Sequence, residues 1–279
     1  MAHEIRQIDE QSVAQLIAIA DRDPIKQCFV GARLELTRMG MIRPAYPDLL
    51  GYFDDGHLKS AIYLGANLIP INTTQISRNE FASVLKKEGR RCSSITGPAA
   101  EVLPLWQLLE PKWGKAREIR DNQPLMAITT RSEIKPDELV RYATTADLDV
   151  LYPACIHMFT EEVGVSPVGP GTGLAYRNRI AELISDKRSF VRIENDEVVF
   201  KAEVGTIGNN VAQIQGVWVN PKLRGKGLAE PAMAAVVRFI LDDIAGTASL
   251  YVNDFNKPAI ATYSRVGFNQ VDTFATIHF

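Results

Sequence analysis

A glycine-rich stretch, residues 217–229, has the composition of an anion-binding turn between a strand and a helix. It reads VWVNPKLRGKGLA, in which three strand-forming residues precede an Asn-Pro pair that ends strands. Gly225 and Gly227 then flank Lys226, and a long helical pattern follows. The first N–H groups of a helix have no partner within the helix, and glycine lets an anion approach them closely. We therefore expect this turn to bind an anion such as a phosphate group.

Two common phosphate-binding patterns do not fit the stretch. The dinucleotide fingerprint needs a third glycine where this sequence has Glu230, and the P-loop needs Ser or Thr where Gly227 follows Lys226. The remaining pattern is Arg-x-x-Gly-x-Ala, from Arg224 to Ala229, directly after a Val-x-Val strand end. It resembles the coenzyme A pyrophosphate loop of the GNAT N-acetyltransferase superfamily. An ordinary glycine-rich connection is the alternative for so short a loop.

A second signature, within residues 249–268, resembles the same superfamily. Asn256 is expected to cap a helix, Tyr263 lies one to two turns further on, and Gly267 is placed to end the helix. The order of strand, Asn-x-x-Ala, Tyr and Gly-Phe is similar to the second GNAT signature. The two signatures follow each other at a plausible distance, and the resemblance covers residues 138–279.

The resemblance implies a site for acetyl-coenzyme A as a cosubstrate, without a metal ion. N–H groups of the loop would bind the pyrophosphate, with Arg224 or Lys226 adding positive charge. The strand edge at 217–219 would pair with the pantetheine arm, and the N–H of Trp218 or Val219 would stabilise the oxyanion. The residues so assigned to the cofactor are Val217, Trp218, Val219, Arg224, Gly225, Lys226, Gly227, Leu228, Ala229 and Asn256.

Proton transfer is assigned to Tyr263 and Glu203. Tyr263 lies where the family usually has its tyrosine, and a phenol with a pKa of about 10 suits protonation of a departing thiolate. A tyrosine of the packed core is the alternative. Many members carry a carboxylate on the strand before the loop, but this strand offers only glutamines, so the nearest carboxylate is Glu203 on the preceding strand. Glu161 and Glu162, which end an earlier helix, are further candidates for the base, and a water relay is another.

Composition excludes several classes of function. The hydrophobic content of 46% and charged content of 23% are those of a globular chain, and a net charge of -2 argues against bulk nucleic-acid binding. No apolar run approaches the roughly 18 residues of a membrane helix, and the first residues lack the apolar core of a signal peptide. The three cysteines are far apart and are expected to be reduced core residues. We therefore expect a cytoplasmic protein that binds neither nucleic acid nor membrane.

The length of 279 residues suits two domains, and the polar segment 131–138 is the best linker. This predicts one domain over residues 1–132 and a GNAT domain over residues 133–279. The first half is expected to begin with a helix over 12–20, capped by Ser12, and to contain a strand, turn and helix over 92–109. We interpret it as an uncharacterised, degenerate GNAT-like domain in which 92–109 corresponds to the cofactor loop without its motif, so that it does not bind coenzyme A.

The second half is expected to follow the GNAT order of elements. A helix starting near Thr145 leads to a Gly- and Pro-rich loop over 164–173, interpreted as an acceptor-side loop, and then to a second helix over 176–184. Strands over 190–193, 197–204 and 211–219 precede the glycine-rich turn. The predicted fold class is α/β, with a mixed sheet in two tandem acyl-CoA N-acyltransferase (GNAT) domains.

The predicted function is transfer of an acetyl group from acetyl-CoA to a primary amine by direct attack in a ternary complex. The acceptor is a small-molecule amine or an amine of a peptide or protein, and the sequence does not identify it. A coenzyme A-binding sensor or interaction protein with little transfer activity is the alternative. The first half is expected to cover the acceptor side or to form a homodimer.

Overall fold

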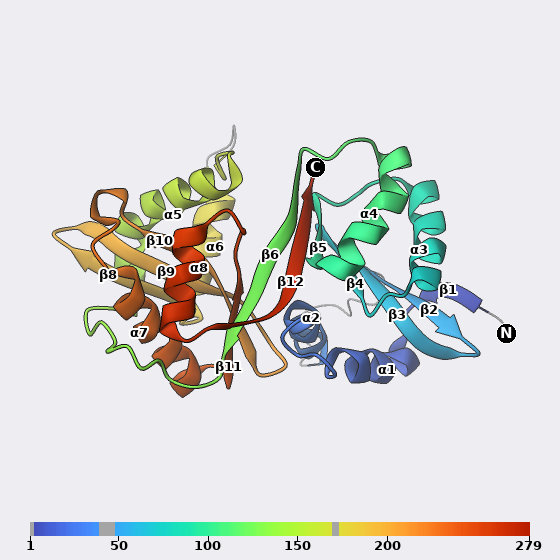
Figure 1. The fold of residues 1–279 in the computed structure, drawn as a ribbon, viewed down its shortest axis with the longest axis horizontal. Helices are drawn as coiled ribbons and strands as arrows, with labels where there is room; N and C mark the ends of the chain where they lie inside the picture. The colour runs from blue at the N-terminus through green and yellow to red at the C-terminus, as the bar shows by residue number, and fades with distance from the viewer. Residues whose placement is uncertain (1–2, 39–47, 169–172) are drawn as a thin grey trace.

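A single mixed sheet, with 12 strands among the described residues, runs through both halves of the molecule (Figure 1). The computed structural model describes residues 3–38, 48–168 and 173–279. The order of strands across the sheet is β1-β2-β3-β4-β5-β12-β6-β11-β10-β9-β8-β7. The tandem mixed α/β architecture expected from the sequence is therefore present.

The first half contains four helices among its described residues. They are α1 (Glu10–Ala20), α2 (Cys28–Arg38), α3 (Gln75–Glu88) and α4 (Ala99–Trp113). Its strands are β1 (His3–Gln7), β2 (Leu49–Asp54), β3 (His57–Leu64), β4 (Asn67–Ile71), β5 (Ser94–Pro98) and β6 (Glu118–Ile128). Helices α3 and α4 pack on one face of this sheet, against Ile62 and Leu68, and α1 and α2 pack on the other, against Ala61 and Ile69. The alternation along β3 and β4 assigns neighbouring residues to opposite cores.

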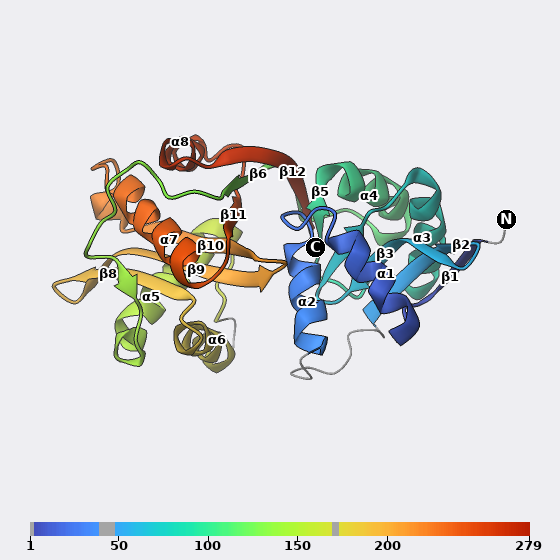
Figure 2. The same cartoon turned by 90° about the horizontal axis from the view of Figure 1, so that it is seen from below.

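The second half repeats this arrangement. Its helices are α5 (Leu148–Val163), α6 (Leu174–Ser185), α7 (Ala229–Asp243) and α8 (Lys257–Val266), with single 3-10 turns at Thr145–Asp147 and Pro221–Leu223. Its strands are β7 (Arg141–Tyr142), β8 (Ser189–Glu194), β9 (Glu197–Gly208), β10 (Val211–Val219), β11 (Thr247–Tyr251) and β12 (Asn269–His278). Figure 2 shows α7 and α8 on one face of the sheet and α5 and α6 on the other. The expected loop over 164–173 lies partly outside the described residues, since 169–172 are not described.

The two halves exchange strands. The last strand of the first half, β6, pairs antiparallel with β11, where Ala127 lies opposite Ser249. The final strand of the chain, β12, is inserted between β5 and β6, with Thr276 opposite Thr96 of β5 (Figure 1). The predicted boundary between residues 132 and 133 stays a prediction for the sequence, but the hydrogen bonds of the sheet are not divided there.

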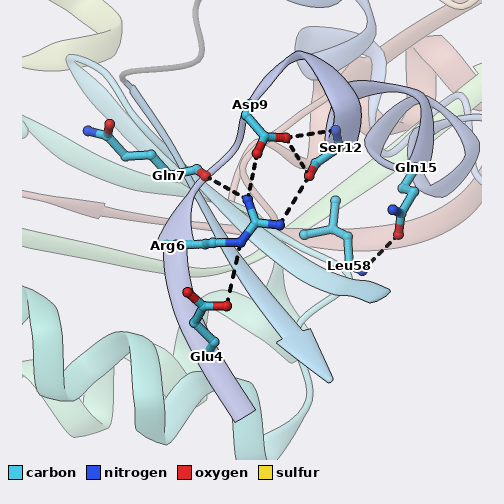
Figure 3. A network of polar contacts seen from close by, with 7 residues as sticks. All are labelled: Glu4, Arg6, Gln7, Asp9, Ser12, Gln15 and Leu58. Atoms are coloured by element: carbon cyan, nitrogen blue, oxygen red, sulfur yellow. Dashed lines mark hydrogen bonds and ion pairs between the residues drawn. The ribbon is translucent and has the colours of Figure 1, made fainter. Parts of the chain in front are cut away.

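The cap of the first helix differs from the prediction. Asp9, not Ser12, precedes α1, and its carboxylate accepts hydrogen bonds from the Ser12 backbone N at 2.9 Å and hydroxyl at 2.7 Å (Figure 3). Arg6 of β1 donates to the same carboxylate at 2.9 Å. Both residues are good caps, and the helix begins earlier because Asp9 can reach a free N–H group of the first turn. Gln15 then ties the helix to the sheet by accepting from the Leu58 N–H at 2.8 Å.

The correspondence of elements between the halves also differs from the prediction. The expected strand, turn and helix over 92–109 are β5 and α4, which occupy the same place in the first half as β11 and α8 in the second. The counterpart of the glycine-rich turn is instead the link of residues 72–74 between β4 and α3. Sequence patterns alone suggested the wrong pair because both units are a strand followed directly by a helix.

The structure confirms the expected burial of the cysteines and shows two further features. The hairpin turn between β2 and β3 contains Asp55 and Gly56 with positive φ. The three cysteines are buried and form no disulfide. Among the described residues, no helix has both the length and the apolar character needed to cross a bilayer.

Candidate functional site

The glycine-rich turn is held open by its own backbone. Asn220 ends β10, donates from its backbone N to Val199 of β9 at 3.0 Å, and accepts from the Lys222 N at 3.1 Å through its side chain. Gly225 and Gly227 then adopt φ of 75° and 74°, in the left-handed region that favours glycine. A Cβ at either position would meet no atom within 4 Å. The turn and the N-terminus of α7 therefore face open space, as an anion site requires.

The two cations of the turn differ in their partners. Arg224 forms a bidentate pair with Glu161 of α5, with distances of 2.6 and 2.7 Å, and also donates to the Val219 carbonyl at 3.1 Å. The hydrogen bond to Glu161 raises the pKa of Arg224. Lys226 makes no hydrogen bond or ion pair with any described residue. Arg224 thus joins the turn to α5, and Lys226 is the cation that is free to meet a ligand.

Strands β10 and β11 are hydrogen bonded over only part of their length. Their parallel pairing covers Val211–Gln213 of β10, and the rest of β10 has no partner on that side. Because the Asn220 N–H points to β9, the alternation of a strand directs the N–H of Val219 away from β9 and that of Trp218 toward it. The free edge of β10 therefore favours Val219 over Trp218 as an oxyanion donor.

A bulge interrupts β10 in the middle of this free edge. The register with β9 shifts between Gln215 and Trp218, and Gly216 has a φ of 59°. Below the bulge, Glu203 is nearly buried and accepts from Gln215 at 3.0 Å and from Lys201 at 3.3 Å. Both partners use lone pairs that a base would need, so the geometry does not favour Glu203 as the base.

Tyr263 lies on the packed side of α8, as the core alternative predicted. It is buried, contacts Phe268 edge-on at 6.0 Å between ring centroids, and belongs to the core below α7 and α8. Burial, and next the charge of Glu162, raise the pKa of its phenol well above the usual range. Its hydroxyl forms no hydrogen bond with another described residue. It is also not fully enclosed by protein atoms, so solvent or a ligand can reach it. The phenol is therefore protonated and available to a ligand.

Asn256 caps α8, as expected. Its side chain accepts from the Ala259 N–H at 3.3 Å, and Gly267 ends the same helix in the left-handed conformation. Contact of Asn256 with the cofactor stays a prediction.

Of the three candidate carboxylates Glu161, Glu162 and Glu203, only Glu162, in the last turn of α5, has a side chain without a hydrogen bond or ion pair. Its side chain is exposed to solvent, and desolvation by the surrounding protein raises its pKa. Tyr251 on β11 has the same combination, and the charge of Glu162 contributes to the raised pKa of both Tyr251 and Tyr263. Arg120, on the exchanged strand β6, donates to the backbone carbonyl of Glu162 at 2.8 Å. The end of α5 is therefore held next to the two tyrosines by a residue of the first half.

Two residues of this region were missed by the sequence analysis. Lys201 is fully buried beneath the bulge, and Arg120 reaches across from the first half. Lys201 had a signal, because it and Glu203 are opposite charges two residues apart in an otherwise apolar strand. Arg120 had none, since only the exchange of strands brings it to α5.

The corresponding place in the first half is filled by the protein itself. At the N-terminus of α3, the backbone N and hydroxyl of Thr73 donate to the carboxylate of Glu101, at 2.6 and 2.8 Å. Burial raises the pKa of this carboxyl. An internal acid thus occupies the position where the second half offers an open helix end. Within the described residues, no group of three or more His, Cys, Asp or Glu side chains could hold a metal ion.

A splayed parallel strand pair, a bulge at its free edge and an open glycine turn into a helix are the features expected of the acyl-CoA N-acyltransferase (GNAT) fold. Comparison with family models agrees. The model of the GNAT acetyltransferase family matches residues 155–268, and a domain of unknown function (DUF4081) matches residues 47–151. The chain therefore carries a C-terminal GNAT acetyltransferase domain that is preceded by a DUF4081 domain.

Solved structures extend the likeness to the whole chain. A Drosophila protein is 12% identical with a TM-score of 0.67 and coverage of 100% of this chain and 99% of its own. A GCN5-related N-acetyltransferase from Sphaerobacter thermophilus is 16% identical, with a TM-score of 0.61 and coverage of 99% and 95%. A tandem GNAT protein from the clavulanic acid biosynthesis pathway is 13% identical, with a TM-score of 0.57 and coverage of 99% and 98%. These likenesses show the fold. The comparison with curated proteins returned no significant match.

Proposed function

We propose that the protein transfers an acetyl group from acetyl-CoA to a primary amine by direct attack within a ternary complex. The observation that carries this proposal is the open turn at Gly225 and Gly227 beside the free edge of β10. The turn and Lys226 bind the pyrophosphate, and the edge of β10 pairs with the pantetheine arm. Acetyl-CoA is the cosubstrate in this proposal, and the open surroundings of both glycines leave room for its pyrophosphate.

The acceptor amine meets Glu162 in this proposal. An ammonium group must lose a proton before its nitrogen can attack, and a carboxylate attracts that cation and takes the proton. Glu162 is the best-supported carboxylate because its side chain is unpaired, whereas Glu161 is bound to Arg224 and Glu203 to Lys201. The raised pKa of Glu162 brings its basicity closer to that needed at neutral pH.

Tyr263 and the edge of β10 act on the donor side. N–H groups of β10, among them that of Val219, stabilise the negative charge that develops on the thioester oxygen. The Tyr263 phenol, kept protonated by its raised pKa, gives its proton to the departing thiolate sulfur. The ammonium group gives its first proton to Glu162, which releases it to solvent. The nitrogen loses a second proton as the tetrahedral intermediate collapses, and this proton restores the Tyr263 phenol through water.

The first test is calorimetric titration of the full chain with acetyl-CoA, beside a Gly227→Glu variant. The added carboxylate would stand where the pyrophosphate binds, so we expect the parent to bind and the variant to lose binding. Gly89→Glu is the matched control, because Gly89 has a φ of 79° and equally open surroundings but lies in the first half. It adds the same charge and backbone strain away from the turn.

The titration and a transfer assay distinguish the enzyme from a coenzyme A sensor. Binding by the parent and the control, but not by Gly227→Glu, supports the cofactor and its loop. No binding by the parent would overturn the enzyme proposal. Binding without transfer to any member of a wide amine and peptide panel would favour a coenzyme A sensor instead.

A further inference from the structure

Lys201 is a buried cation to which the proposed reaction assigns no step. Its side chain has 0% exposure and lies on β9 beneath the bulge of β10. The ammonium group donates to the Gly216 carbonyl at 3.0 Å and to the Glu203 carboxylate at 3.3 Å. Burial acts to lower the pKa of Lys201, but Glu203 outweighs it and the pKa is raised, so the lysine is charged. Cys155 of α5 is a third partner of the ammonium group. Burial of a charge is costly, and these partners offset part of that cost.

The hydrogen bond to Gly216 fixes the orientation of one peptide unit. In a trans peptide, the carbonyl and the following N–H point in opposite directions. Lys201 holds the Gly216 carbonyl, so the Val217 N–H must point away from Lys201. A cation on the carbonyl oxygen also polarises the peptide and makes that N–H a stronger donor.

The bulge leaves the Val217 N–H without a partner on the neighbouring strand. Between Lys201 and Glu203, β9 offers only Ala202, and the alternation of β9 directs Ala202 toward β8, since the Val204 N–H donates to Arg188 on that side. On the other side of β10, pairing with β11 has already ended at Gln213. The Val217 N–H is therefore free at the edge where the thioester is proposed to lie.

We propose that Lys201 is a positioning residue that aims the Gly216–Val217 peptide, so that the Val217 N–H donates to the thioester carbonyl oxygen. This inference rests on the proposed function and adds to it a second donor beside Val219 and a buried cation behind it. Lys201 touches neither substrate. It acts only through the peptide that it holds.

The glycine at the bulge is consistent with this role. A Cβ at position 216 would lie 3.0 Å from the Lys201 nitrogen and 3.1 Å from the Glu203 carboxyl carbon, and the φ of 59° is strained for other residues. A side chain there would push the ammonium group off the carbonyl. Gly216 therefore allows both the bulge and its contact with Lys201.

The test is isotope-edited infrared spectroscopy of acetyl-CoA, labelled with carbon-13 at the acetyl carbonyl, bound to the full chain. A donor on the thioester oxygen lowers its carbonyl stretching frequency relative to free solution. The variant is the double substitution Lys201→Met with Glu203→Gln, which leaves no unpaired buried charge. Arg131→Met with Asp242→Asn is the matched control, because it removes one ion pair, of 2.7 Å, on the surface. For each protein, calorimetry measures the Kd for acetyl-CoA and thermal unfolding measures stability.

We expect the parent and the control to show the lowered frequency and the double variant to lose most of it. Its Kd for acetyl-CoA should stay within roughly tenfold of the parent, since one hydrogen bond changes while the other contacts remain. Gly216→Ala keeps both charges and should weaken the shift as well, which tests the idea if the double variant does not fold.

The outcomes separate the two proposals. If the parent binds acetyl-CoA and the folded double variant or Gly216→Ala keeps the full shift, the role of Lys201 is wrong and the proposed function stands. If the parent binds with no shift at all, the role is likewise wrong. If the parent does not bind acetyl-CoA, the proposed function falls, and the inference falls with it.

Discussion

Three carboxylates near the site differ in what already holds them. Arg224 binds Glu161 through both oxygens, and Lys201 and Gln215 bind Glu203. Glu162 has only its backbone carbonyl engaged, by Arg120. The usefulness of each acid therefore depends on its partners more than on its distance along the chain from the glycine-rich turn.

Replacing Glu162 with Gln is expected to lower kcat/KM at neutral pH by about 100-fold, the low end of the effect of a lost general base. The pKa of Glu162 is raised by burial, so parent activity should fall as pH decreases through a value above the ordinary 4.5. The variant should lose that acidic limb, because Gln does not titrate. A pH–rate profile with an identified amine measures both effects.

The control for Glu162 is Glu182→Gln on α6, an exposed acid paired with Arg179. It should keep the parent profile. An unchanged acidic limb in Glu162→Gln would assign that limb to another group and remove Glu162 from the reaction.

Replacing Tyr263 with Phe should separate binding from turnover. The ring and its packing on Phe268 remain, so the Kd for acetyl-CoA should not change. The value of kcat should fall by about 100-fold, because no phenol protonates the departing thiolate. Tyr142→Phe is the control, since that tyrosine lies on the edge strand β7 and its hydroxyl bonds Asp243 at the end of α7. Equal kcat for Tyr263→Phe and the parent would leave Tyr263 as a core residue only.

At the scale of elements, the start of α5 depends on a capping box at Thr144, one residue before the start near Thr145 that the sequence suggested. Thr144, not Thr145, precedes the helical turn, and its N–H and hydroxyl donate to Asp147 at 2.7 and 2.9 Å. Arg141 pairs with the same carboxylate at 2.7 and 2.9 Å. Because Glu162 lies at the other end of this helix, the box helps to position the proposed base.

Asp147→Asn is expected to lower the free energy of unfolding by about 2 kcal/mol at neutral pH, as charge-assisted bonds to a nearly buried carboxylate are lost. The hydrogen bond from Arg141 is the main cause of the lowered pKa of Asp147. A lowered pKa stabilises the fold above the unfolded value of about 4, and this contribution disappears as pH falls through the lowered pKa. Denaturant unfolding of parent and variant at several pH values should therefore converge in acid. A constant difference down to the lowest pH would contradict this origin.

The elements also show why the first half is not a second cofactor site. Its counterpart of the glycine-rich turn has no glycine, and Glu101 already accepts from Thr73 at the helix end. The sequence analysis expected no coenzyme A binding there, but for a different turn. The carboxylate that fills the place comes from α4, and its reach to α3 is a matter of packing.

At the scale of the whole molecule, the exchange of β6 and β12 makes the halves interdependent. A fragment of residues 134–279 would lack β5 and β6, so β11 would lose one strand partner and β12 would lose both of its partners. We expect this fragment to be aggregated or incompletely folded. Unpaired strand edges form hydrogen bonds with other chains, and the core beside them is exposed to solvent. Size-exclusion chromatography and circular dichroism measure this.

A fragment of residues 115–279 is the matched comparison, because it restores β6 and leaves only the β5 edge of β12 unpaired. It should be better folded than the shorter fragment. A monomeric 134–279 fragment that binds acetyl-CoA as the parent does would show that the second half needs nothing from the first.

The sequence by itself determined the local features: the glycine-rich turn, the cap at Asn256, the hairpins and the alternation of strands that mark a GNAT domain. These depend on backbone conformation and on neighbours within a few residues, which short patterns encode. The partner of each polar side chain was decided only by the tertiary structure. Arg120 reaches Glu162 across 42 positions of sequence, and the Gly216 carbonyl receives Lys201 across 15. Such contacts form where exchanged strands and a bulge bring distant residues together, and burial then sets their charge state.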